Sequence, residues 1–184
     1  WMETVLFDPE GMEQVIDRMV PFTVDFANRL FAEGAAFIVS PCAFSSPTLV
    51  TRDIASTFAR PVLERTLSGL QGPVVIHHGG APVLAHLDLL SDLPSVIGYV
   101  VDARDCLADA REIIGPEKIL FGGPDNHSLP GLSAEKVEQW CCSILEDRAS
   151  DPRFVLCNSG PDIPLHTPPE NIDAFRKTTG RDLI

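Results

Sequence analysis

The chain has 184 residues, of which 45% are hydrophobic and 22% are charged, and its 14 basic and 26 acidic side chains give a formal net charge of −12. This composition excludes a disordered tail, a collagen-like repeat and a disulfide miniprotein, and it predicts one globular domain over residues 1–184. No apolar run reaches the roughly eighteen residues that a membrane span needs. The acidic balance argues against nucleic acid and against an anionic membrane surface as partners.

The start of the chain has neither the basic residues nor the apolar stretch of a secretory signal. The five cysteines show no repeated Cys-x-x-Cys spacing. An odd number of cysteines without such spacing is typical of reduced thiols. We therefore expect a cytoplasmic protein.

Hydrophobic spacing, interrupted by proline and glycine, predicts a regular alternation of helices and strands. The first helix is expected over residues 9–33. The elements expected after it are strand 36–40, helix 52–70, strand 74–78, helix 82–91, strand 96–101, helix 105–114, strand 118–121, helix 133–147, strand 154–157 and helix 168–179.

Several of these helices carry start or break signals. Asp8 is the expected N-cap of the first helix, and Pro21 is expected to kink or split that helix. Pro61 is a predicted break in the second helix. Thr167 and Glu170 have the spacing of a capping box at the start of the last helix.

The predicted strands are short, apolar on both sides and separated by amphipathic helices, which is typical of parallel strands in βα units. The residues alone leave two arrangements open. Five strands are enough for a doubly wound sheet, whereas a complete (β/α)₈ barrel needs eight strands and about 250 residues.

In either arrangement, ligands bind beyond the carboxyl ends of the strands. Polar, ionisable and glycine residues follow all five predicted strands. These strand ends are residues 40–42, 77–80, 102–104, 122–127 and 157–162. The pattern indicates a small-molecule site more than the surface of a binding module.

Individual residues at these ends have both a catalytic and a structural interpretation. Adjacent side chains on a strand point to opposite faces, so at most one of His77 and His78 should face a barrel interior. Asp102 and Asp125 could act in catalysis or cap a turn. Cys42 could be a thiolate ligand or a nucleophile, or it could be a buried, unreactive thiol.

The strand-end motifs resemble those of the uroporphyrinogen decarboxylase superfamily, and within it the branch of methylcobalamin:coenzyme M methyltransferases. The resemblance extends over nearly the whole chain, and its most specific part runs from Asp162 to Ile172. The matching pieces are Glu33-Gly34-Ala35, His77 with Gly80, Asp102, Gly122-Gly123-Pro124-Asp125, and Ser159-Gly160-Pro161-Asp162-Ile163-Pro164 leading into Thr167-Pro168-Pro169-Glu170-Asn171-Ile172.

Members of that superfamily are (β/α)₈ barrels of roughly twice this length. The resemblance therefore implies an α/β fold in which residues 1–184 form the C-terminal five βα units of a (β/α)₈ TIM barrel. The first three strands would lie upstream of this chain. The open edges of the sheet would then be covered by an upstream segment or by another chain, for example in a homo-oligomer.

The methyltransferase branch binds zinc through a His-x-Cys pair and a later cysteine. The corresponding residues here are His77, Gly79 and Pro161. Glycine and proline have no side chain that can bind a metal, so only His77 remains as a ligand and zinc is not expected. His78, Cys157 or Asp162 could replace the missing ligands.

The resemblance implies a methyltransferase that moves a methyl group to or from a corrinoid carried by a partner protein. With the thiolates missing, a donor of the methoxy or methylamine type suits the remaining residues better than a thiol acceptor. The expected catalytic residues are His77, Asp102 and Asp125. The expected substrate-binding residues are Cys42, Gly79, Gly80, Asn126 and Asp162.

Two other functions stay open. A uroporphyrinogen decarboxylase would hold the carboxylates of its substrate with arginines that come largely from the N-terminal part of the barrel. The only tyrosine of this chain, Tyr99, lies inside a predicted strand, and no late Gly-His-Gly turn is present. The other alternative is a relative that binds a tetrapyrrole or corrinoid without catalysis.

Overall fold

The computed structural model describes residues 2–180, apart from the side chains of Met2 and Phe44. Its centre is one five-stranded sheet in which every pair of neighbouring strands is parallel. The strands are β1 (Ile38–Pro41), β2 (Val74–His77), β3 (Val96–Val100), β4 (Ile119–Gly122) and β5 (Phe154–Leu156).

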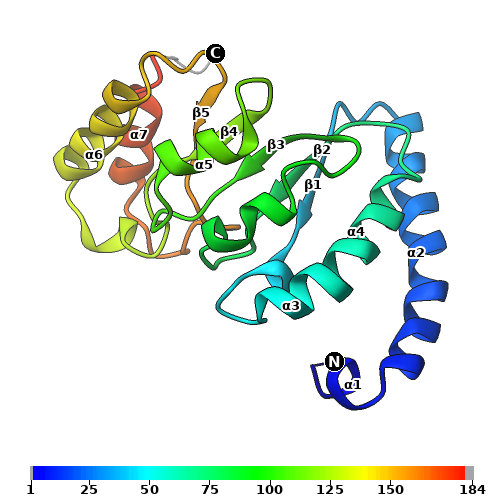
Figure 1. Ribbon diagram of the computed structural model, residues 1–184. Coiled ribbons are helices and arrows are strands. Elements are labelled where there is room, and N and C mark those ends of the chain that lie inside the picture. Colours follow the sequence, from blue (N-terminus) through cyan, green and yellow to red (C-terminus); the bar gives the residue numbers. More distant parts are fainter. Residues whose placement is uncertain (1, 181–184) are drawn as a thin grey trace.

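Helices follow the strands and lie around the outside of the sheet, in an arc from α2 at one end to α6 and α7 at the other (Figure 1). The α-helices are α1 (Met2–Phe7), α2 (Pro9–Ala32), α3 (Arg52–Ile54), α4 (Arg60–Leu67), α5 (Leu107–Ile114), α6 (Ala134–Asp147) and α7 (Pro169–Lys177). The shorter helical segments are η1 (Ala43–Ser45), η2 (Ala55–Ala59), η3 (Leu84–Leu89) and η4 (Leu129–Gly131).

The strand order decides between the two arrangements that the sequence leaves open. The strands lie in the order β1-β2-β3-β4-β5, so each crossover moves one place in the same direction. A doubly wound sheet reverses direction at a switch point and carries helices on both faces. The observed order is that of consecutive strands in a (β/α)₈ barrel, and the expected five βα units are confirmed.

Helix α2 is continuous over 24 residues, so of the two expectations for Pro21, a kink or a split, the split is wrong. The helix begins where predicted, because the Asp8 side chain accepts a hydrogen bond of 3.0 Å from the backbone of Gly11 and Pro9 takes the first turn. Pro21 removes one hydrogen bond from the interior of the helix. Packing of the buried side chains of Met12, Ile16 and Ala27 holds the helix together across that gap.

The second predicted helix is interrupted before Pro61 rather than at it. Residues Ala55–Ala59 form a wider π-type turn in which the N–H of Arg60 bonds to the carbonyl of Ala55. A wider turn leaves one carbonyl without a partner, and Pro61 is the neighbouring residue that has no N–H to offer. The predicted helix 82–91 is also shorter and tighter, since Leu84–Leu89 form a 3₁₀ helix.

The capping box predicted at Thr167 is absent. Helix α7 starts at Pro169 with Pro168 as its N-cap, and no side chain caps it. Thr167 is buried, and its hydroxyl oxygen has no hydrogen-bond partner among the described residues. Because Pro168 rather than Thr167 is the N-cap, the threonine lies one residue before the helix and its hydroxyl is not placed to cap the first turn.

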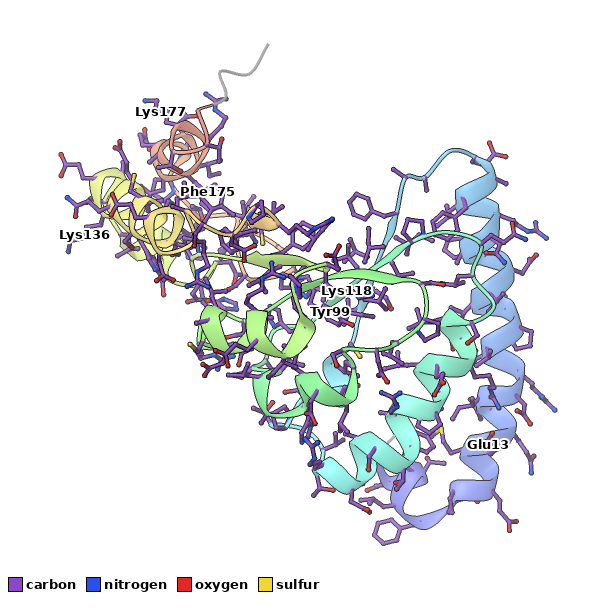
Figure 2. All side chains as sticks on the ribbon, turned by 45° about the horizontal axis from the view of Figure 1, so that its top comes forward. Glu13, Tyr99, Lys118, Lys136, Phe175 and Lys177 are labelled. Atoms are coloured by element: carbon purple, nitrogen blue, oxygen red, sulfur yellow. The ribbon has the colours of Figure 1, made fainter. Side chains whose placement is uncertain are left out.

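The two faces of the sheet have different surroundings because side chains alternate along each strand. On the outer face, Val74, Ile76, Tyr99 and Leu120 belong to a buried core beneath the helices. Tyr99 is 1% exposed and donates a hydrogen bond of 2.6 Å to the carbonyl of Leu90. Figure 2 shows Tyr99 near the middle of the molecule. The inner face of the sheet lines a cavity.

Candidate active site at the carboxyl ends of the strands

Two cavities open at the carboxyl ends of the strands. The inner cavity, of about 620 Å³, lies on the inner face of the sheet and includes His77 and Gly79. The polar cavity, of about 470 Å³, lies between the loops that follow β3, β4 and β5 and includes His78 and Asp102. Gly160 and Pro161 line both, so the loop after β5 separates them.

The inner cavity is mostly apolar. Its walls come from the side chains that alternate with the buried core positions: Phe37, Val39, Val75, Val100 and Phe121. Among the described residues that line it there is no Lys, Arg, Asp or Glu. His77, Cys157 and Asn158 supply its polar side chains. Burial raises the pKa of the Cys157 thiol to about 12, so this group is not a thiolate near neutral pH.

His77 is held as a neutral imidazole with a defined tautomer. Its Nδ1 accepts a hydrogen bond of 2.9 Å from the backbone N–H of Gly79, which places the ring proton on Nε2. Burial lowers the pKa of His77 below 6.5, and the neighbouring His78 lowers it further, while a backbone interaction with Gly160 acts in the opposite direction. Near neutral pH the ring is therefore uncharged.

His78 is almost completely buried, at 1% exposure, and contacts the loop after β5. Its Nε2 hydrogen-bonds the carbonyl of Ser159, and its Nδ1 accepts 3.0 Å from the N–H of Gly80. The two histidines line different cavities, yet their rings stack with centroids 4.6 Å apart. Strand β2 ends at His77, and the positive φ angles of Gly79 and Gly80 turn the chain, so strand alternation does not extend to His78.

The buried carboxylate of Asp102 forms an ion pair with Arg104, whose side chain is largely exposed. The guanidinium binds both carboxylate oxygens, at 2.6 and 2.9 Å, and the backbone N–H of Arg104 donates to the same group at 2.9 Å. Burial alone would raise the pKa of Asp102, but the hydrogen bonds from Arg104 outweigh it and the pKa is lowered. Asp102 is therefore ionised near neutral pH and is a poor proton donor.

The loop after β4 fastens the loop after β5. Asn126 is 2% exposed, and its Nδ2 donates 2.8 Å to the carbonyl of Asp162. The N–H of Ser159 donates 3.0 Å to the carbonyl of Pro124. Together with the bond between His78 and Ser159, these contacts fix the wall that separates the two cavities.

The expected site residues do not all meet in one place. His77 and Gly79 line the inner cavity, whereas Gly80, Asp102, Asp125 and Asn126 line the polar cavity. Cys42 lies in a smaller apolar pocket beneath β1, where burial raises the pKa of its thiol and its Sγ is 3.1 Å from Ser45 Oγ. The side chain of Asp162 is exposed, and only its carbonyl takes part in the loop contacts.

Arg104 and Trp140 also line the polar cavity and are not among the site residues expected from the sequence, whereas His78 is expected there only as an alternative ligand. The Asp102-x-Arg104 spacing at the start of a loop is a usable signal for a local ion pair. No motif marks Trp140, which reaches the cavity from α6, about forty residues away along the chain from Asp102.

The zinc site of the methyltransferase branch does not fit these residues. Within residues 2–180, no group of three His, Cys, Asp or Glu side chains is placed to hold a metal ion. Gly79 has a φ of +76°, and a Cβ there would lie 2.7 Å from the Cβ of Ala43, so this position has no room for a ligating side chain. His77 is left without partners for a tetrahedral site.

Comparison with known proteins identifies the family. A family model described as uroporphyrinogen decarboxylase (URO-D) matches residues 1–181. The chain belongs to the uroporphyrinogen decarboxylase family. Among 26 matching chains of solved structures is a methyltransferase from Methanosarcina mazei, with a TM-score of 0.83 and 22% sequence identity.

The alignment with that methyltransferase covers 97% of this family member and 52% of the other chain, so the chain spans about half the length of its structural neighbour. At 22% identity, the likeness establishes a shared fold. A search of curated proteins found no match. Each helix among the described residues is too short or too polar to cross a bilayer.

Proposed function

We propose that this member of the uroporphyrinogen decarboxylase family transfers a methyl group between a small-molecule donor and a corrinoid carried by a partner protein. The main observation that supports the proposal is the inner cavity. It is a large, mostly apolar space at the carboxyl ends of the strands, and it contains one neutral imidazole. Such a site suits a weakly polar donor whose leaving atom takes a hydrogen bond. The methyltransferase neighbour supports this reaction class at the level of fold.

The described residues of this chain that line the inner cavity offer no positive charge, so the arginines that a tetrapyrrole decarboxylase needs would have to come from another part of the barrel. A substrate with several carboxylates is normally held by Arg or Lys side chains. The described residues that line the inner cavity include neither. The net charge of −12 also gives no general attraction for an anionic substrate.

The candidate residues divide into two roles in this proposal. A bound donor would take over the interaction that His77 makes with the backbone of Gly160, and His77 would orient the leaving atom or exchange a proton with it. Asp102 and Asp125 act from the polar cavity by fixing the loops after β3 and β4, because neither lines the inner cavity. No step uses zinc.

Formation of methylcobalamin from cob(I)alamin, followed by absorbance, tests the proposal. Cob(I)alamin stands in for the partner-bound corrinoid, and the donors are methoxylated aromatic compounds and methylated amines. We expect conversion that depends on the protein for one donor class and that survives a metal chelator. Formation of coproporphyrinogen from uroporphyrinogen, or zinc-dependent methylation of a thiol alone, would contradict the proposal.

A further inference from the structure

The polar cavity has its own chemistry, and we propose that it binds a small organic cation of the alkylated-ammonium class. It is separated from the inner cavity by Gly160 and Pro161, and its volume of about 470 Å³ is in the range of small-molecule sites. Binding there goes beyond the proposed methyl transfer and does not depend on it.

The charges around the polar cavity favour a cation. Arg104 is the only Arg or Lys among the described residues that line it. Both carboxylate oxygens of Asp102 bind that guanidinium, so the positive charge is already matched. Asp125 and Asp105 also lie close enough to act on Arg104. The two carboxylates that line the cavity, Asp102 and Asp125, against one guanidinium leave an excess of negative charge there.

Asp125 is the carboxylate available to a ligand. It forms no ion pair with a Lys or Arg in the part of the chain that the structure describes. Its orientation is fixed by the hydroxyl of Ser128, which donates 2.7 Å, and by the backbone N–H groups of His127 and Ser128, at 3.3 and 3.0 Å. A carboxylate held in place before binding loses little conformational entropy when a cation arrives.

Trp140 makes an organic cation a better fit than a metal ion. Its half-buried side chain lines the cavity from helix α6, and a tryptophan ring attracts an alkylated ammonium group through its π-face. A metal ion would need several ligating side chains together, and residues 2–180 contain no such group of three. The apolar surface of Pro161 can contact the alkyl groups of the ligand.

Fluorescence of Trp140 provides a direct binding test. The chain has two tryptophans, and Trp1 lies outside the described residues, so a Trp1→Phe variant leaves Trp140 as the reporter. In this background choline is the probe, and its neutral carbon isostere dimethylbutanol is the control ligand. We expect a saturable change with choline and binding at least about tenfold weaker for the isostere.

Two matched variants test where the cation binds. Asp125→Asn keeps the shape of the turn and removes the charge, and we expect it to weaken choline binding by about fivefold or more. Glu138→Gln removes one charge from an exposed position of α6 outside the cavity lining and should leave binding unchanged. Trp140→Leu, followed by calorimetry, should weaken binding as well.

Equal binding of choline and the isostere would overturn the proposal, as would unchanged binding in Asp125→Asn or the absence of any signal up to about 100 mM choline. If Asp125→Asn does not fold, Trp140→Leu decides the same question. None of these measurements requires a corrinoid or turnover. A failed methyl-transfer assay and a failed cation site are therefore distinguishable results.

Discussion

Because Gly123 has no side chain, the loop after β4 can run close beside β5. A Cβ at this position would lie 1.9 Å from the carbonyl oxygen of Cys157, which is backbone and cannot rotate away. We expect Gly123→Ala to lower the free energy of unfolding by about 3 kcal/mol, measured by urea denaturation. At Gly131 a Cβ would meet nothing within 4 Å. Similar losses in Gly123→Ala and Gly131→Ala would show that the close approach is not what constrains residue 123.

The lowered pKa of His77 predicts a pH dependence of stability. Because the pKa of the folded state lies below the ordinary value of 6.5, the unfolded chain binds the proton more readily. The stability contributed by His77 is therefore complete above pH 6.5 and is lost as the pH falls through the folded-state pKa. His77→Gln should flatten the plot of unfolding free energy against pH below 6.5, whereas His166→Gln, at an exposed loop position, should not. An unchanged slope in His77→Gln would refute the assignment.

At the scale of single residues, the positions of the strand ends could be predicted from the sequence. How the strand-end residues are distributed between the two cavities could not. His77 and Asp102 both follow strands, so their position at one edge of the sheet could be predicted. Their separation into two cavities depends on the loop at Ser159–Pro161, which reaches back to His78 over 81 residues of chain. No local pattern encodes that contact.

The long helix α2 contains an internal proline, and its effect on the free energy of unfolding can be measured. Pro21 is exposed and lacks the N–H that would bond within the helix, whereas Pro9 occupies the first turn, where no such bond is made. We expect Pro21→Ala to raise the free energy of unfolding by about 2 kcal/mol and Pro9→Ala to leave it unchanged or to lower it slightly. Thermal unfolding followed by circular dichroism gives both values. A loss of stability in Pro21→Ala would mean that packing against α4 requires the proline.

At the scale of elements, the five strands could be predicted to within about two residues, because short apolar runs bounded by Gly and Pro give clear limits. Helix type was harder to predict. Hydrophobic spacing does not distinguish an α-helix from the π-type turn at Ala55–Ala59 or from the 3₁₀ helix at Leu84–Leu89, and it does not show contacts between these segments. Arg60, for example, bonds the carbonyl of Leu89, which links the two irregular segments.

At the scale of the whole molecule, α2 presents an apolar stripe to solvent. The stripe consists of Val15, Met19, Phe22, Phe26 and Leu30, with exposures of 52, 52, 66, 56 and 39%. Exposed apolar surface of this extent, next to the open inner face of the sheet, is typical of a surface that associates.

We expect the chain studied alone to self-associate with increasing concentration in sedimentation velocity. Phe22→Asp combined with Phe26→Asp should reduce association, and Thr23→Asp, on an exposed polar position of the same helix, should not. A monomer at all concentrations would contradict this expectation.

The overall architecture was the most predictable feature. Regular alternation of strands and helices, with the family motif at the strand ends, indicated five consecutive βα units, and the strand order confirms them. Which candidate residues line the inner cavity and which line the polar cavity could not be predicted. The assignment depends on which side of the loop after β5 each side chain lies.

The most direct test of the proposed function compares the rate of methylcobalamin formation from cob(I)alamin in the unmodified chain and in His77→Ala. The exposed His166→Ala variant is the control, and thermal unfolding verifies that each variant is folded. We predict a loss of roughly a hundredfold or more in His77→Ala and a normal rate in His166→Ala. An undiminished rate in folded His77→Ala would contradict the assignment of the inner cavity as the site of methyl transfer.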